Sequence, residues 1–256
     1  MRAPSLAIVT QPFRRLVASV IATTLVAACS AQPAPDAEAT ETAPPPAVPS
    51  TPAPASPDLA ACPAREPVEE GLRERTKPIP VPAVFAQVMR ADMDNFAFTT
   101  AGGATVCVDV SWLESIRDPA LSPDKRFASF DWDGYEAYGH VIVDRSGKGQ
   151  VVDTGVPPVA SPSGKLLAAA DLGEAGFGAL NAFAVWRIEP AGLRQLAKHE
   201  DMSATDWRIE SWAGEACVDL SAIAWDGYTG DPGTPRARFH AREGEGWRLE
   251  PGACAR

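Results

Sequence analysis

The sequence predicts an all-β protein whose antiparallel, four-stranded repeats form a small or incomplete β-propeller-like stack. Three observations favour this fold class. Apolar and polar residues alternate over short segments, turns rich in Gly, Pro and Asp separate these segments, and short motifs recur at intervals typical of a propeller blade. A single β-sandwich is the alternative.

The composition fits one or two globular domains. The chain has 256 residues, of which 45% are hydrophobic and 22% are charged. Its formal net charge of −10 excludes a typical nucleic-acid-binding protein, because such proteins need a basic face to neutralise phosphates.

The first 28 residues have the organisation of an export signal. Arg2, Arg14 and Arg15 are followed by the uncharged run LVASVIATTLVAA, which ends at Ala28. This run is shorter than the about 20 apolar residues that a transmembrane helix needs. Its end, Leu-Val-Ala-Ala followed by Cys29, resembles the lipobox of bacterial lipoproteins, with an aliphatic residue three positions before the cysteine and small residues between.

The lipoprotein resemblance implies that residues 1–28 are a signal peptide and that Cys29 is acylated, for example with palmitate. Ser30 follows the cysteine where an inner-membrane lipoprotein of enterobacteria has Asp, which implies lipid anchoring in the outer membrane with the domain in the periplasm. Removal of three arginines lowers the formal charge from −10 to −13, so anionic headgroups would not attract the protein. We expect the acyl chains alone to hold it.

Residues 29–67 form a predicted tether. The segment consists mainly of Ala, Pro, Thr, Ser and Glu, and it has too few large apolar side chains to offset the chain entropy of folding. It is expected to be disordered and extended, with a reach on the order of 100 Å. Residues 68–256 form the predicted β-repeat domain.

Strands are predicted wherever short apolar segments lie between turn residues. The predicted strands are 95–100, 104–110, 125–131, 140–144, 150–153, 183–188, 207–212, 217–225, 236–240 and 247–249. A helical pattern is limited mainly to residues 82–93.

Internal echoes divide the domain. LSPDK at 121–125 recurs as ASPSGK at 160–165, WDGY at 132–135 recurs at 225–228, and CVDVS at 107–111 recurs as CVDLS at 217–221. The period is close to the length of a propeller blade. We infer three repeats, at 118–158, 159–203 and 204–252, after a hairpin at 95–116.

The segments that begin at Leu121 and Ala160 resemble the S-P-D-G-K repeats of WD40-like propellers of the TolB type. Lys125 replaces the usual Gly in the first copy, and Ser163 replaces the usual Asp in the second. The resemblance implies four-stranded blades that act as a rigid scaffold for exposed loops. Three repeats are fewer than a closed propeller takes, so we expect an incomplete ring or an open stack.

Four cysteines remain once Cys29 is lipidated, and an oxidising compartment favours two disulfides among them. The candidates are Cys62, Cys107, Cys217 and Cys254. Cys107 and Cys217 begin the echoed CVD motif and are expected in equivalent strands, so each is expected to bond its nearer partner: Cys62 with Cys107, and Cys217 with Cys254. Both bonds would hold a chain end on the sheets.

Few residues suit catalysis. No G-x-S-x-G motif occurs, and His140, His199 and His240 are interpreted as surface or packed residues of strands. Asp131-Trp-Asp133-Gly resembles the start of a calcium loop, and an irregular Ca²⁺ site that includes Glu136 and Asp144 is one interpretation. A turn between strands is the preferred interpretation. No catalytic residue, metal site or cofactor is therefore predicted.

The best candidate for binding is the glycine-rich loop at 173–181, which carries the apolar residues Phe177 and Leu180. The sequence thus predicts a non-enzymatic binding scaffold for another envelope protein or envelope component. One alternative is an immunity or inhibitor lipoprotein that neutralises a toxin enzyme in the periplasm. An envelope hydrolase is the less favoured alternative.

Overall fold

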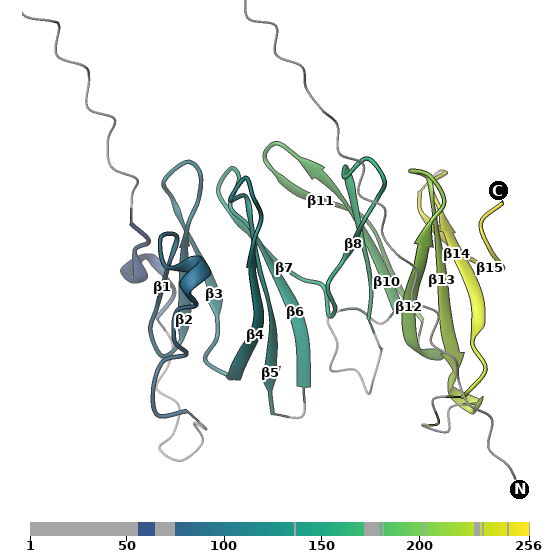
Figure 1. Ribbon diagram of the computed structural model, residues 1–256, viewed down its shortest axis with the longest axis horizontal. Helices are drawn as coiled ribbons and strands as arrows, with labels where there is room; N and C mark the ends of the chain where they lie inside the picture. The colour runs from purple at the N-terminus through teal and green to yellow at the C-terminus, as the bar shows by residue number, and fades with distance from the viewer. Residues whose placement is uncertain are drawn as a thin grey trace, which may run out of the picture. The chain divides into compact units, whose positions relative to one another are not determined.

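The strands of this chain form four antiparallel sheets, each with three or four strands that are consecutive in sequence (Figure 1). The computed structural model describes residues 56–64, 75–135, 137–171, 180, 182–201, 203–227, 231, 233–244 and 246–255. The predicted signal peptide, Cys29 and Phe177 lie outside the described residues. The described residues belong to one unit, Thr51–Arg256.

The sheets are lettered in chain order. Sheet A contains β1 (Met89–Ala91), β2 (Asn95–Thr99) and β3 (Thr105–Asp109). Sheet B contains β4 (Leu113–Leu121), β5 (Phe127–Gly134), β6 (Ala137–Asp144) and β7 (Gln150–Asp153). Sheet C contains β8 (Val159–Ala160), β9 (Leu166–Ala170), β10 (Ala182–Glu189) and β11 (Gly192–Glu200). Sheet D contains β12 (Ala204–Trp212), β13 (Cys217–Ala224), β14 (Ala237–Arg242) and β15 (Arg248–Pro251).

The helical elements of the described chain are short 3₁₀ turns: η1 (Leu59–Ala61), η2 (Ala83–Phe85) and η3 (Trp225–Gly227). None of the described helices is long and apolar enough to cross a bilayer.

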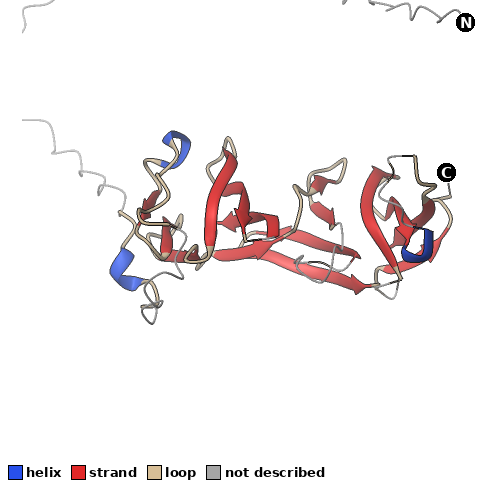
Figure 2. Cartoon of the chain, turned by 90° about the horizontal axis from the view of Figure 1, so that it is seen from below, coloured by secondary structure: helices blue, strands red, loops and turns tan. Residues whose placement is uncertain are grey.

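Each pair of neighbouring sheets shares a hydrophobic core. Sheets A and B bury one cluster between them, in which the rings of Phe96 and Phe130 meet edge to face at 5.7 Å. A second cluster, with Ile142 of sheet B and Trp186 of sheet C, fills the next interface. A third, centred on Phe183 and Trp207, joins sheets C and D. The sheets therefore follow one another in chain order (Figures 1 and 2).

The stack is open, as the number of repeats predicts: in the described chain, sheet D does not close onto sheet A. Because the core is divided among four sheets, the alternative of a single two-sheet sandwich is wrong. Both terminal sheets consequently have one face that no other sheet covers.

The N-terminal end of the stack is capped by residues 56–64. Successive strand residues point to opposite faces, so Cys107 lies on the face of sheet A away from the core residue Val108. Cys62 bonds Cys107 there, and the backbone N–H of Asp58 donates to Thr105 Oγ1 at 3.0 Å. This short segment, which the sequence assigns to the tether, is thus part of the folded unit.

The C-terminal end of the stack is capped in the same way. Cys217 lies on the outward face of sheet D and bonds Cys254, whose backbone N–H donates to Asp219 Oδ1 at 2.7 Å. Both predicted disulfide pairings are confirmed. The expectation that Cys107 and Cys217 occupy equivalent strands is wrong, because β3 is an edge strand whereas β13 lies between β12 and β14.

The helical expectation for residues 82–93 is also wrong. The segment forms η2, whose Phe85 is buried in the core, and then enters β1. Residues 113–116, expected at the end of the first hairpin, instead begin β4 of sheet B. A β-bulge interrupts the pairing of β4 with β5 between Arg117 and Ala120, where Asp118 adopts a positive φ of 48°.

Candidate functional site

A surface cleft of about 550 Å³ lies between sheets B and C, a volume within the usual range for ligand sites. Most of its wall is apolar, and Asp118, Ser129, Asp131 and His140 are its polar residues. The described residues that line the cleft are Asp118, Ala120, Phe127, Ser129, Asp131, His140, Ile142, Pro157, Pro158, Leu167 and Ile188.

Strand alternation places the polar groups of sheet B in this cleft. Ser129, Asp131 and Asp133 lie two residues apart on β5 and therefore share one face of the sheet. His140 of β6 is the direct cross-strand partner of Asp131. Its Nδ1 donates to Asp131 Oδ1 at 2.6 Å, and its side chain is only 8% exposed.

The pairing of His140 with Asp131 fixes the orientation of the imidazole ring. Because Nδ1 is engaged by the carboxylate, Nε2 is the ring nitrogen left for a ligand. Ser129 lines the same cleft, but no hydrogen bond joins it to His140 among the described residues. The described side chains therefore form a positioned acid–imidazole pair without an assembled nucleophile.

The cations nearest the cleft are already paired. Arg117 donates two hydrogen bonds to Asp133, with Nε at 2.8 Å from Oδ2 and Nη2 at 2.9 Å from Oδ1. These bonds hold the pKa of Asp133 below its usual value. Arg126 bonds both carboxylate oxygens of Asp144 in the same way.

The acidic groups of the cleft keep part of their hydrogen-bonding capacity. Asp131 uses Oδ1 for His140, which leaves Oδ2 for a ligand. Asp118 is exposed at the bulge of β4 and makes no hydrogen bond within the described chain. No Lys or Arg occurs among the described lining residues, so the cleft has an acidic, apolar character.

A third carboxylate, Asp153, lies close to this site. Burial raises its pKa, and the nearby charge of Asp171 adds to the increase, whereas a hydrogen bond from the Gly155 N–H and the proximity of His140 oppose it. The N–H lies 3.0 Å from Asp153 Oδ1. The carboxylate is therefore held in an environment that disfavours its charged form.

The proposed binding loop has a different role at one of its ends. The side chain of Leu180 is only 2% exposed and packs in the core between sheets B and C, and its N–H donates to Asp171 Oδ2 at 3.2 Å. As a surface contact for a partner, Leu180 is thus excluded. An apolar residue beside a Gly-rich segment can face either the core or solvent, and sequence does not distinguish the two.

The calcium hypothesis receives no support from the described side chains. Asp133 and Asp144 are occupied by arginines, and Asp131 by His140. No group of three or more His, Cys, Asp or Glu side chains in the described chain could hold a metal ion.

The two other histidines lie away from the cleft. Nε2 of His199 donates to the carbonyl oxygen of Trp247 at 2.7 Å, a contact between sheets C and D. His240 of β14 lies beside Glu250 of the neighbouring strand, with 3.6 Å between Nε2 and Oε2.

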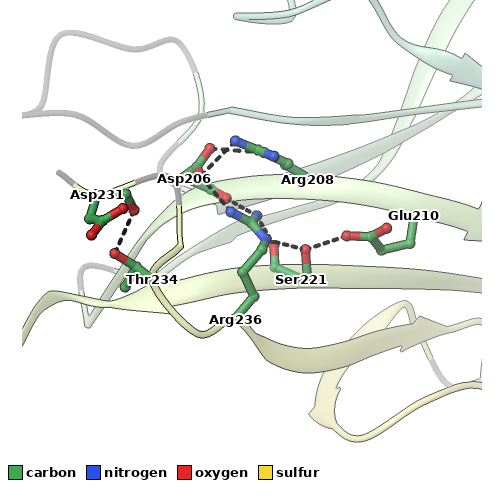
Figure 3. Close-up of polar contacts among 7 residues, drawn as sticks. All are labelled: Asp206, Arg208, Glu210, Ser221, Asp231, Thr234 and Arg236. Carbon is green, nitrogen blue, oxygen red and sulfur yellow. Dashed lines mark hydrogen bonds and ion pairs between the residues drawn. The ribbon is translucent and has the colours of Figure 1, made fainter. Parts of the chain in front are cut away.

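A second polar cluster occupies the outward face of sheet D (Figure 3). Arg236 bonds the side chain and carbonyl of Asp206, and its Nε donates to Ser221 Oγ at 2.8 Å. Ser221 in turn donates to Glu210, and Arg208 pairs with Asp206 at 2.9 Å. The carboxylate of Asp206 pairs with both arginines, so this cluster holds the start of β14 against the sheet. It also makes the exposed end of the stack polar.

The sequence interpretation gave His140 and Asp131 no binding or catalytic role and did not pair them. The sequence predicts a strand that ends at Asp131 and a turn from Asp131 to Gly134, whereas β5 continues to Gly134 and places Asp131 opposite His140. The usable signal was the alternation of Ser129, Asp131 and Asp133 on one strand face. Comparison with known proteins adds nothing to this geometry, since no family model matches the chain and no curated protein is significantly similar to it.

Proposed function

We propose that this protein is a lipid-anchored binding scaffold of the bacterial cell envelope, and that it captures an envelope protein in the cleft between sheets B and C. The observation that carries the proposal is the cleft itself. Its walls are apolar, Asp118 and Asp131 provide carboxylate oxygens that accept no hydrogen bond within the described chain, and the buried imidazole of His140 is held in place by Asp131. A few polar groups in an apolar concavity are the usual composition of a binding site.

The stack gives this cleft a firm support. A hydrophobic cluster fills each interface between neighbouring sheets, and a disulfide holds each end of the described chain on a terminal sheet. A binding surface on such a scaffold loses little conformational entropy when it is occupied.

The anchoring part of the proposal rests on the lipobox-like residues around Cys29 and on the acidic charge. Labelling cells with a clickable fatty acid tests it: the wild-type chain should be labelled and the Cys29→Ala variant should not. Absence of label on the wild-type chain would contradict lipidation. Fractionation then tests the outer-membrane assignment, which recovery in the inner membrane would contradict.

Site-specific photocrosslinking in cells tests the binding part. A photoreactive amino acid at Ala120, an exposed residue of the cleft wall, should give a discrete adduct with one partner. The same amino acid at Val151 is the matched control, because Val151 is 38% exposed and pairs with Val143 on the opposite face of sheet B. No adduct at Ala120, or the same adducts at both positions, would refute the role of the cleft.

A further inference from the structure

We infer that the cleft between sheets B and C recognises a basic side chain, Arg or Lys, that lies beside apolar residues in a segment of a partner protein. The inference rests on the proposed function and specifies the chemistry of the occupant. It depends on charge complementarity at named groups of the cleft, on the apolar wall around them, and on the state of the neighbouring arginines.

Two carboxylates of the cleft can accept further hydrogen bonds. Asp118 and Asp131 both line the cleft, and each has carboxylate oxygens without a protein partner in the described chain. A guanidinium or ammonium group that reaches them forms charge-assisted hydrogen bonds, which are stronger than neutral ones. An anionic ligand would meet the same carboxylates with repulsion.

Two arginines near the cleft form their hydrogen bonds with other groups. Arg117 is the cross-strand partner of Asp131, yet two of its nitrogens bond Asp133. Arg126 is bound to Asp144 and to the carbonyl oxygen of Glu189, which is 2.5 Å from Nη2. Neither guanidinium makes a hydrogen bond to Asp118 or Asp131 in the described chain, although the charge of Arg117 interacts with both carboxylates. A cation from a partner can therefore hydrogen-bond these carboxylates without displacing an existing arginine bond.

Apolar side chains from both sheets form most of the cleft wall. Phe127 and Ile142 of sheet B and Leu167 and Ile188 of sheet C line the cleft. They belong to one apolar cluster, and the guanidinium of Arg126 lies 4.8 Å from the centre of the Phe127 ring. A fully hydrated cation alone would leave these surfaces wet, whereas apolar neighbours of a basic residue would cover them and exclude water. The acidic net charge of the chain adds long-range attraction for a basic partner.

Three peptides that differ in one side chain test the inference on the full lipidated chain in detergent micelles. They are acetyl-Leu-Arg-Leu-amide, the same peptide with neutral citrulline in place of arginine, and the same peptide with glutamate. The readouts are the dissociation constant and the NMR signals of the Ile142 and Ile188 methyl groups and the His140 ring. The arginine peptide should shift these signals and bind about tenfold more tightly than the citrulline peptide.

Variants assign the preference to the cleft. Asp118→Asn and Asp131→Asn together should abolish the advantage of arginine over citrulline, since the amides keep the shape and remove the charge. Asp226→Asn, which neutralises an exposed carboxylate of η3, is the matched control and should leave the advantage intact.

Each contrary outcome has a separate meaning. If the arginine and citrulline peptides shift the cleft signals with equal affinity, the preference for a cation is wrong, while the cleft remains a binding site. If the arginine peptide leaves the cleft signals unchanged, the inference is overturned, and crosslinking from Ala120 still decides the proposed function independently.

Discussion

The guanidinium of Arg126 bonds both carboxylate oxygens of Asp144, whose side chain is completely buried, at 3.0 and 2.8 Å. Burial alone would raise the pKa of Asp144, but these bonds and those from Ser146 hold it below its usual value. Arg126 also donates to the Glu189 carbonyl of β10. One side chain therefore neutralises the Asp144 carboxylate of sheet B and links sheet B to sheet C. The pair therefore supports the interface that contains the cleft.

Arg126→Leu should lower the free energy of unfolding by about 3 kcal/mol, because it leaves a buried carboxylate without its partner. Urea denaturation measures this change. Arg187→Leu is the matched control: its pair with Glu243 also spans two sheets, but both side chains are about 40% exposed, so its loss should cost at most about 1 kcal/mol. Equal decreases in the free energy of unfolding of the two variants would show that the buried pair stabilises the fold no more than the exposed pair does.

The contribution of Asp153 to stability should be less favourable at neutral than at mildly acidic pH. Its pKa is raised in the folded state, so its contribution to stability is fully present below the unfolded pKa and is lost as the pH rises through the folded pKa. Asp153→Asn keeps an acceptor for the Gly155 N–H and removes the charge. It should raise the free energy of unfolding at neutral pH by about 1 kcal/mol.

Urea denaturation between about pH 4 and pH 7 isolates this effect as the difference between variant and wild type, because the carboxylates with lowered pKa values are common to both. Asp231→Asn is the control, since Asp231 accepts a similar bond from the Gly233 N–H at 2.9 Å but is exposed. A variant at residue 153 that is no more stable than wild type at pH 7 would contradict the assignment.

The C-terminal disulfide should stabilise sheet D. It closes a loop across a sequence separation of 37 residues, so replacing Cys217 and Cys254 together by Ala should lower the free energy of unfolding by about 3–4 kcal/mol. Amide hydrogen exchange should rise at the outward face of sheet D, where the Cys254 N–H now bonds Asp219. Exchange that rises equally in sheet A would show that the bond does not act locally.

A strand with clear alternation was predictable from the sequence to within a few residues, as β5 illustrates. The strands that were not predicted individually lack that signal for identifiable reasons. β9 reads LLAAA because both of its faces are largely buried, while β4 contains Pro119 and a bulge and is mostly exposed. β11 is an edge strand with several charged residues.

The candidate site was less predictable than the fold. Cross-strand pairing of Asp131 with His140 depends on the register of the β5–β6 hairpin, and the walls of the cleft come from a second sheet. Neither is encoded in the local pattern of either strand. The disulfide pairings were predictable because sequence proximity favours them, even though the strands that carry Cys107 and Cys217 are not equivalent.

Sheets B and C contain the same type of turn, at residues 122–125 and 161–164. In sheet B, the Ser122 N–H donates to the Phe127 carbonyl at 2.8 Å, and the Phe127 N–H donates to the Ser122 hydroxyl at 2.9 Å. Ser161 and Leu166 make the same two bonds in sheet C, at 2.9 and 3.2 Å. The fourth residue of each turn has a positive φ: 58° at Lys125 and 69° at Gly164. Only glycine adopts this conformation without strain.

Substitutions at both positions test whether backbone geometry, rather than side-chain packing, explains the preference for glycine at the fourth position of the turn. A Cβ at Gly164 would meet no atom within 4 Å, so Gly164→Ala should cost about 1 kcal/mol through backbone strain alone. Lys125→Gly should release the corresponding strain and change the free energy of unfolding by about 0.5 kcal/mol in the opposite direction, because greater freedom in the unfolded chain offsets part of the gain. Thermal and urea denaturation of both variants measure the two effects. If Lys125→Gly destabilised the protein as much as Gly164→Ala, side-chain contacts of Lys125, such as the 3.5 Å approach of Nζ to Gln87 Oε1, would outweigh the backbone strain that the turn imposes.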